Sequence, residues 1–244
     1  MLHNHVEAPN MAEVSTAEWI RRRLCWVAGP LVVVLLAVGL AIYAFAIQSE
    51  AKSILKDVSG LRVGVSTIED VQALAAHHKL ALRDEHCEPG KCSVSFQVYN
   101  TWLYRLKLEP IAGFWAHVEV NGETVSSIKI MLSRETNVFP TSPSAGITEE
   151  YRAMPERFGV STTYSFPTPV GKPYLNVVLT GQATPIQREH AYAYSLKCLI
   201  KPGAGCDLPC DYLPLAWHDW QAELEEEGWV GGFGPYYPTR SRCR

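Results

Sequence analysis

The sequence lacks the signals by which several large functional classes are recognised. It has no excess of positive charge, because 22 lysines and arginines stand against 25 aspartates and glutamates, for a formal net charge of −3. Binding to nucleic acid needs a basic surface, so we expect no nucleic-acid partner. The chain also has no glycine-rich phosphate loop, no G-x-S-x-G, no H-E-x-x-H and no C-x-x-C. We therefore assign no catalytic residue, no cofactor and no metal site, and an enzymatic role is less favoured than a non-enzymatic one.

Acceptor sequences for N-glycosylation are absent as well. None of the six asparagines begins an N-x-Ser/Thr sequence. This absence favours a bacterial envelope over a eukaryotic secretory route.

One long apolar segment is present near the N-terminus. Residues 24–47 contain no charged side chain, and as a helix rising about 1.5 Å per residue they span the roughly 30 Å core of a bilayer. Three arginines, Arg21 to Arg23, precede the segment, whereas its other flank mixes acidic and basic residues. Because basic flanks stay in the cytoplasm, we predict a single-pass membrane protein. Its residues 1–23 form a cytoplasmic tail, its segment 24–47 contacts lipid, and its C-terminal domain is extracytoplasmic.

A signal peptide or a buried core helix would also contain a long apolar segment. A signal peptide cleaved after Ala46 would begin with basic residues, as this chain does, and Ala44-Phe45-Ala46 resembles a cleavage site. The apolar core of a signal peptide usually runs about 7–15 residues, however, and this one is longer. A buried core helix is the other alternative, and the uniform apolarity of this segment on every face argues against it.

The cysteines agree with an external domain. Six of the seven follow the apolar segment, and an even number in an oxidising compartment indicates disulfides: Cys87, Cys92, Cys198, Cys206, Cys210 and Cys243. The first two flank a turn-prone Glu-Pro-Gly-Lys sequence and form our firmest predicted bridge. The other four allow three pairings, of which Cys198 with Cys206 or Cys210 is plausible, leaving Cys243 to hold the tail. A zinc site built from Cys198, Cys206 and Cys210 with His190 or His218 fits no strong ligand spacing.

The alternation of apolar residues predicts an α+β fold of antiparallel hairpins with a few short helices. We expect a stalk over residues 48–60, a first α+β unit over 61–134, a linker loop over 135–150 and a second, β-rich unit over 151–244. Predicted strands cover 93–99, 104–108, 114–120, 128–132, 174–179 and 192–200, and a helix covers 215–227. Asn121-Gly122 predicts a hairpin with a type I′ turn.

The best-signalled helix begins near Ser66. Ser66 and Glu69 have the spacing of a capping box, and Ile68, Val71, Leu74 and Ala75 recur on one face. His77 and His78 occupy adjacent positions that cannot share one helix face, so we interpret both as surface residues.

A short motif in this helix resembles a known family. Gly64-Val65-Ser66-Thr67, Glu69-Asp70-Val71 and Leu74 are similar to the opening helix motif of the BamE (SmpA/OmlA) outer-membrane assembly lipoproteins. The resemblance implies a helical pair before a short antiparallel sheet, in an envelope protein that acts through its surfaces. The chain departs from the family in having no lipobox cysteine and a second half without a counterpart.

Aromatic residues in the tail carry the remaining functional signal. Trp229, Tyr236 and Tyr237 lie in an irregular, glycine-rich segment and form a possible interaction surface. The favoured hypothesis is a membrane-anchored interaction or structural module with a protein partner in the envelope. The alternatives are an extracytoplasmic hydrolase and a small-molecule or metal-binding sensor.

Overall fold

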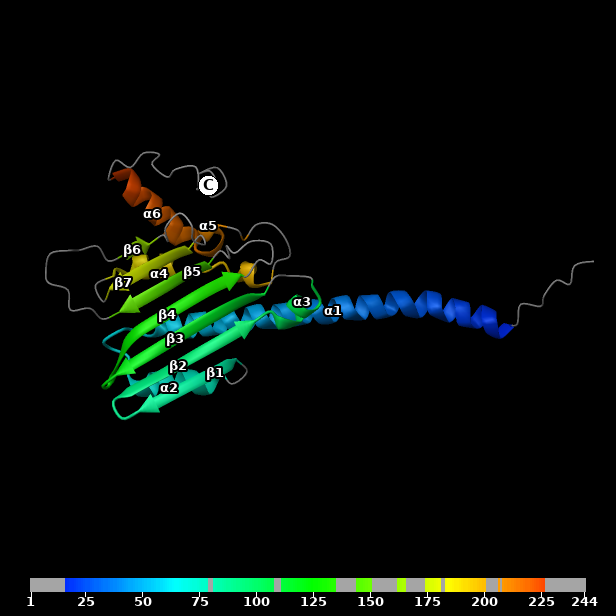
Figure 1. Cartoon of the computed structure of the whole chain (residues 1–244), viewed down its shortest axis with the longest axis horizontal. Helices are drawn as coiled ribbons and strands as arrows, with labels where there is room; N and C mark the ends of the chain where they lie inside the picture. The colour runs from blue at the N-terminus through cyan, green and yellow to red at the C-terminus, as the bar shows by residue number, and fades with distance from the viewer. Residues whose placement is uncertain are drawn as a thin grey trace, which may run out of the picture. The chain divides into compact units, whose positions relative to one another are not determined.

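The computed structural model describes residues 16–78, 81–107, 111–134, 144–150, 162–165, 174–180, 183–200, 206 and 208–226 (Figure 1). The chain divides into two compact parts, Met1–Tyr43 and Ala44–Arg244. The second part combines one sheet with several helices, so the predicted α+β class is confirmed.

Helix α1 (Thr16–Gly60) contains the long apolar segment and changes character along its length. Its length and composition from residue 28 onward suffice to cross a membrane. Most large apolar side chains between Leu31 and Phe45 are exposed, Phe45 by 71%. From Ile47, only 7% exposed, side chains are buried at a spacing of three or four: Ile47, Ala51, Ile54, Leu55 and Val58. The predicted stalk is therefore a helix packed into the second part of the chain.

Within the described residues, a seven-stranded sheet forms the centre of that part. Its strand order is β1-β2-β3-β4-β5-β7-β6, and all neighbours are antiparallel except β5 and β7. The strands are β1 (Leu82–Glu88), β2 (Lys91–Tyr99), β3 (Ala112–Asn121), β4 (Thr124–Arg134), β5 (Ser144–Glu150), β6 (Thr162–Ser165) and β7 (Tyr174–Thr180). Because β4 pairs with β5 and β5 with β7, the sheet joins the two predicted units into one. The predicted linker is corrected in the same way, since residues 144–150 are a central strand.

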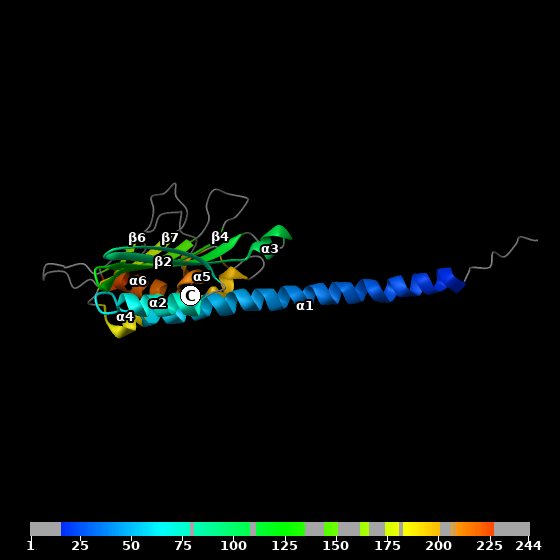
Figure 2. The same ribbon diagram turned by 90° about the horizontal axis from the view of Figure 1, so that it is seen from below.

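The helices gather on one face of this sheet, as Figure 2 shows edge-on. They are α2 (Ile68–His77), α4 (Pro185–Tyr192), the 3₁₀ helix η1 (Leu196–Leu199), α5 (Pro209–Tyr212) and α6 (Pro214–Glu226). Alternate strand residues that face them are fully buried: Val94, Phe96, Phe114, Ala116, Ile128, Ile130, Leu132, Ile147, Leu175, Val177 and Leu179. This is the period of two on which the strand predictions rested, and β2, β3, β4 and β7 are confirmed.

The two hairpins differ in how well their turns were predicted. A disulfide joins Cys87 to Cys92 across the β1–β2 turn, as expected. At the β3–β4 turn, Asn121 still pairs with Thr124, and only Gly122 has a positive φ of 72°. The predicted type I′ turn over Asn121-Gly122 is therefore wrong, since it would need positive φ at both residues. The two residues between the paired Asn121 and Thr124 are Gly122 and Glu123, so the turn lies one residue further along the chain than predicted.

Two segments predicted as strands, 104–108 and 192–200, form no strand in their described residues and lie partly in helices. After β2, the Asn100 side chain accepts a hydrogen bond from Ala112 N (2.7 Å) and its carbonyl accepts one from Tyr104 N (3.1 Å), which turns the chain out of the sheet into α3 (Thr101–Arg105). The 192–200 segment forms the end of α4 and η1. The predicted helix over 215–227 is confirmed as α6.

The start of α2 is shifted by one residue from the prediction. Thr67, not Ser66, is the N-cap, and its backbone N–H donates to the Asp70 carboxylate at 2.8 Å. The Ser66 hydroxyl instead accepts from Arg62 N at 2.9 Å. Gly64 N donates to Val125 O, and Val125 N donates to Ser66 O, so that the α1–α2 connection is fixed to the turn end of the β3–β4 hairpin.

Candidate functional site

Polar side chains converge where the end of α2 lies beside α1. Glu50 and Asp57 are seven residues apart on α1 and therefore lie on one face of it. His77 is the last residue of α2, and His78 follows with φ −97° and ψ 64°, which is no longer helical. Because the backbone leaves the helix there, both adjacent imidazoles reach Asp57. The interpretation of both histidines as surface residues was wrong for His78, whose side chain is only 2% exposed.

The distances in this cluster are those of hydrogen bonds. Asp57 Oδ2 lies 2.8 Å from His77 Nδ1 and 2.9 Å from His78 Nε2. The second nitrogen of His78, Nδ1, lies 3.3 Å from Glu50 Oε1. The His78 ring also contacts Phe96 edge-on, at 5.8 Å between centroids. His78 is thus held by a carboxylate at each nitrogen and by the core at its ring edge.

The Asp57 carboxyl has a lowered pKa. Burial alone would raise its pKa, but the hydrogen bonds and positive charge of His77 and His78 together lower the pKa below its ordinary value of 3.8. Asp57 is therefore a carboxylate at neutral pH, and together with the two neighbouring histidines it supplies groups of the kind that bind cations.

A second polar cluster lies on the sheet face opposite the helices. Ser95 on β2, His117 on β3 and Lys129 on β4 are directly opposite one another in the ladder. Ser95 Oγ lies 2.6 Å from His117 Nδ1, and His117 Nε2 lies 3.0 Å from Glu119 Oε1. Lys129 Nζ donates to the same Glu119 oxygen at 3.2 Å. With the Nε2–H donated to Glu119, Nδ1 is free to accept the hydroxyl proton of Ser95.

A stacked ring and the charges around Glu119 further define this second cluster. The Trp115 ring stacks on the His117 ring at 5.2 Å between centroids, with 9° between the planes. Burial alone would raise the pKa of Glu119, but hydrogen bonds from His117 and Lys129 and their charges lower it below 4.5. A hydroxyl, an imidazole and a carboxylate in this order form the arrangement that activates serine nucleophiles.

A third cluster is buried and structural. Arg188 on α4 donates through Nη2 to Glu149 Oε2 on β5 at 2.7 Å, and Tyr192 donates to the same oxygen at 2.9 Å. Arg188 also donates to the carbonyls of Ser59 and Leu61, at 3.1 and 2.9 Å. Burial and the nearby Glu149 charge raise the pKa of Tyr192 well above 10.0, so it stays a hydrogen-bond donor. This cluster joins the end of α1 to the sheet and to α4.

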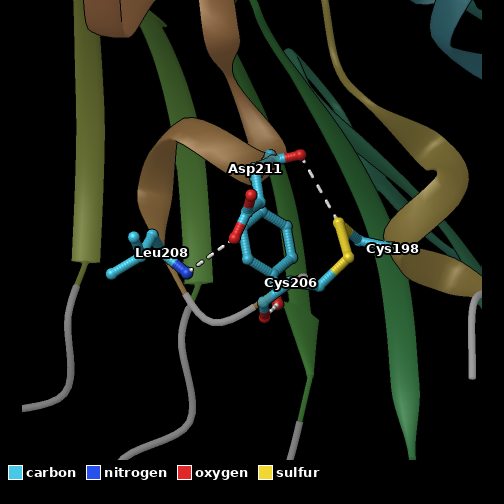
Figure 3. Close-up of a disulfide and its surroundings, with 5 residues drawn as sticks. Cys198, Cys206, Leu208 and Asp211 are labelled. Atoms are coloured by element: carbon cyan, nitrogen blue, oxygen red, sulfur yellow. Dashed lines mark hydrogen bonds between the residues drawn. A yellow bond between two sulfur atoms is a disulfide. The ribbon is translucent and has the colours of Figure 1, made fainter. Parts of the chain in front are cut away.

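The predicted disulfide residues are partly located. Figure 3 shows the Cys198–Cys206 bond beside Asp211, whose carboxylate accepts from Leu208 N at 3.0 Å. Cys210 is also disulfide-bonded, while Cys243 lies outside the described residues. These bonds exclude the zinc site considered at Cys198, Cys206 and Cys210.

The remaining residues singled out from the sequence are two histidines and the aromatic residues of the tail. His190 Nδ1 pairs with Asp219 Oδ2 at 2.8 Å, between α4 and α6. His218 lies on α6. Trp229, Tyr236 and Tyr237 lie outside the described residues, so their role as an interaction surface stays a prediction.

Comparison with protein-family profiles, curated proteins and solved structures found no match to this chain. The resemblance to the BamE lipoproteins therefore stays an expectation from the sequence.

Proposed function

We propose that this chain is a single-pass protein of the bacterial envelope, with residues 1–23 in the cytoplasm and its folded domain outside. The observation that carries the proposal is the run of exposed apolar side chains on α1 between Leu31 and Phe45. Contiguous apolar surface of this size is costly in water, and lipid would cover it on every side. Arg21 to Arg23 and the disulfides Cys87–Cys92 and Cys198–Cys206 support the orientation, because basic flanks remain inside and disulfides form outside.

Protease accessibility tests this orientation. The full chain is expressed in a bacterial host, and protease is added either to spheroplasts or to inverted membrane vesicles. We expect digestion of the domain only in spheroplasts, and N-terminal sequencing should find residues upstream of 24 on the membrane-bound form. Digestion in inverted vesicles alone would overturn the orientation, and a mature protein beginning at Ile47 would make the segment a signal peptide.

For the domain, we propose a role in binding a protein partner of the envelope. This role is supported by the difference between the two faces of the sheet. Helices cover one face, and the other carries the polar row from Ser95 to Lys129. Photo-crosslinking in native membranes from Lys129, with exposed Glu69 on α2 as the control position, tests this role. A partner captured only from Lys129 is expected, and equal capture from both positions would contradict it.

A second candidate function, acyl transfer to Ser95, follows from the Ser95–His117–Glu119 order. In this step His117 Nδ1 takes the hydroxyl proton while Ser95 Oγ bonds to the carbonyl carbon of an activated ester. The leaving group then departs with that proton, and water later hydrolyses the acyl group. A fluorophosphonate probe should label Ser95, and His117→Ala should slow labelling by about 100-fold or more. Ser93→Ala, two residues away on the same strand, is the matched control. Labelling that is absent, or insensitive to His117→Ala, rejects this candidate.

A further inference from the structure

We propose that Asp57, His77 and His78 bind a divalent transition-metal ion of the zinc class, with Glu50 orienting one of the ligands. The carboxylate oxygen and the two imidazole nitrogens all lie within 4.8 Å of one another. They come from two elements, the last turn of α1 and the end of α2, so an ion bound here would link the two helices.

The types of ligand atom select the class of ion. Two imidazole nitrogens and one carboxylate oxygen suit zinc and its neighbours in the first transition series. Magnesium and calcium prefer oxygen ligands alone and would gain little from His77 and His78. An ion that binds nitrogen is therefore preferred at this site over magnesium and calcium.

The position of Glu50 strengthens this assignment. A histidine that binds a metal through one nitrogen commonly donates its other N–H to a carboxylate, which fixes the tautomer and the ring orientation. His78 has this arrangement, because Nε2 faces Asp57 while Nδ1 faces Glu50 Oε1 at 3.3 Å. Its burial and its contact with Phe96 leave the ring little freedom to turn elsewhere.

Little movement is needed to admit the ion. Metal–ligand bonds of about 2.1 Å in a tetrahedral site place ligand atoms about 3.4 Å apart. The observed separations from Asp57 Oδ2 are 2.8 and 2.9 Å, so the ligands would move apart by about half an ångström. The His77 side chain is 67% exposed and free to make this adjustment. Three protein ligands leave one position for water, so the ion can exchange with the surroundings.

Zinc titration of the full chain in detergent micelles tests the site. The protein is stripped with a chelator and titrated with zinc in competition with a chromophoric chelator. We expect one zinc per chain at this site, absent in His77→Ala, and a 10- to 100-fold weaker affinity in Glu50→Gln. Zinc should also raise the melting temperature of the wild type but not of His77→Ala, because the ion links α1 to α2.

His86→Ala is the matched control. His86 Nε2 lies 3.2 Å from Glu88 Oε1, both side chains are exposed, and no second imidazole among the described residues pairs with this carboxylate. Its removal should leave zinc binding unchanged. If His77→Ala binds zinc as the wild type does, the bound metal is adventitious and the site is rejected. Equal competition by magnesium would overturn the assignment of the ion class. Since His77 is exposed, its substitution should not prevent folding, and circular dichroism checks this.

Discussion

Replacing Arg188 by methionine should destabilise the domain more than any surface change. The guanidinium is buried and makes hydrogen bonds to Glu149 and to two backbone carbonyls at the end of α1. Methionine fills a similar volume but donates nothing. Glu149, itself only 3% exposed, would keep a buried charge without its cation.

The magnitude follows from these losses. Removing one partner of a buried ion pair costs about 3–5 kcal/mol, because the remaining charge is left uncompensated. A typical domain has a free energy of unfolding of about 5–15 kcal/mol, so Arg188→Met should remove a large part of it. Arg188→Met with Glu149→Met removes both charges and should recover part of the loss.

Urea unfolding followed by tryptophan fluorescence measures this effect. The full chain is studied in detergent, and Arg105→Met serves as the control because Arg105 is exposed and only lies over the Trp102 ring. That control should change stability by no more than about 1 kcal/mol. An Arg188→Met protein within about 1 kcal/mol of the wild type would refute the reasoning, as would a double variant less stable than the single one.

Three further predictions concern other parts of the domain. Denatured, unreduced protein should not be alkylated at Cys87 or Cys92, and mass spectrometry of the peptides decides this. The lowered pKa of Glu119 means that its contribution to stability is present above pH 4.5 and is lost as pH falls through its folded value. Acid unfolding of Glu119→Gln should accordingly show a smaller pH dependence, and a modest one because Glu119 is partly exposed. Gly113→Ala places a Cβ 2.6 Å from the Tyr99 ring and should cost about 1–3 kcal/mol in thermal unfolding, and Tyr99→Ala should relieve most of this penalty.

Strands were predictable from the sequence where the alternation of apolar residues was the dominant pattern. In β2, β3 and β4 apolar residues alternate over long runs, and the structure buries that alternate set against the helices. The strand predicted from the alternation between Tyr192 and Ile200 was wrong, because a helix, α4, begins upstream and runs into this segment. Thr184 and Gln187 form a capping box with Pro185 between them, a sequence signal that indicates α4 directly.

The metal-binding cluster was only half visible in the sequence. Glu50 and Asp57 are seven residues apart, so a continuous helix places them on one face. His77 and His78 were expected to diverge because a continuing helix separates adjacent side chains by about 100°. The sequence contains no glycine or proline there to signal that the helix ends between His77 and His78. In the structure the His78 ring is buried against Phe96 on β2, a contact that a local sequence pattern does not predict.

The two halves of helix α1 suit different surroundings. Upstream of Phe45, consecutive apolar residues such as Val32, Val33 and Val34 are all exposed, so no single protein face could cover them. Downstream of Ile47, apolar residues recur at helical spacing and are buried in the domain. A cut after Ala46 would remove the first half and leave the buried stripe whole. The domain would then pack the same helix against the same sheet, so its fold is compatible with either an anchor or a signal peptide. An anchor differs from a signal peptide in that its exposed half remains covalently attached to the domain. Only an attached half tethers the Asp57 site to a lipid surface.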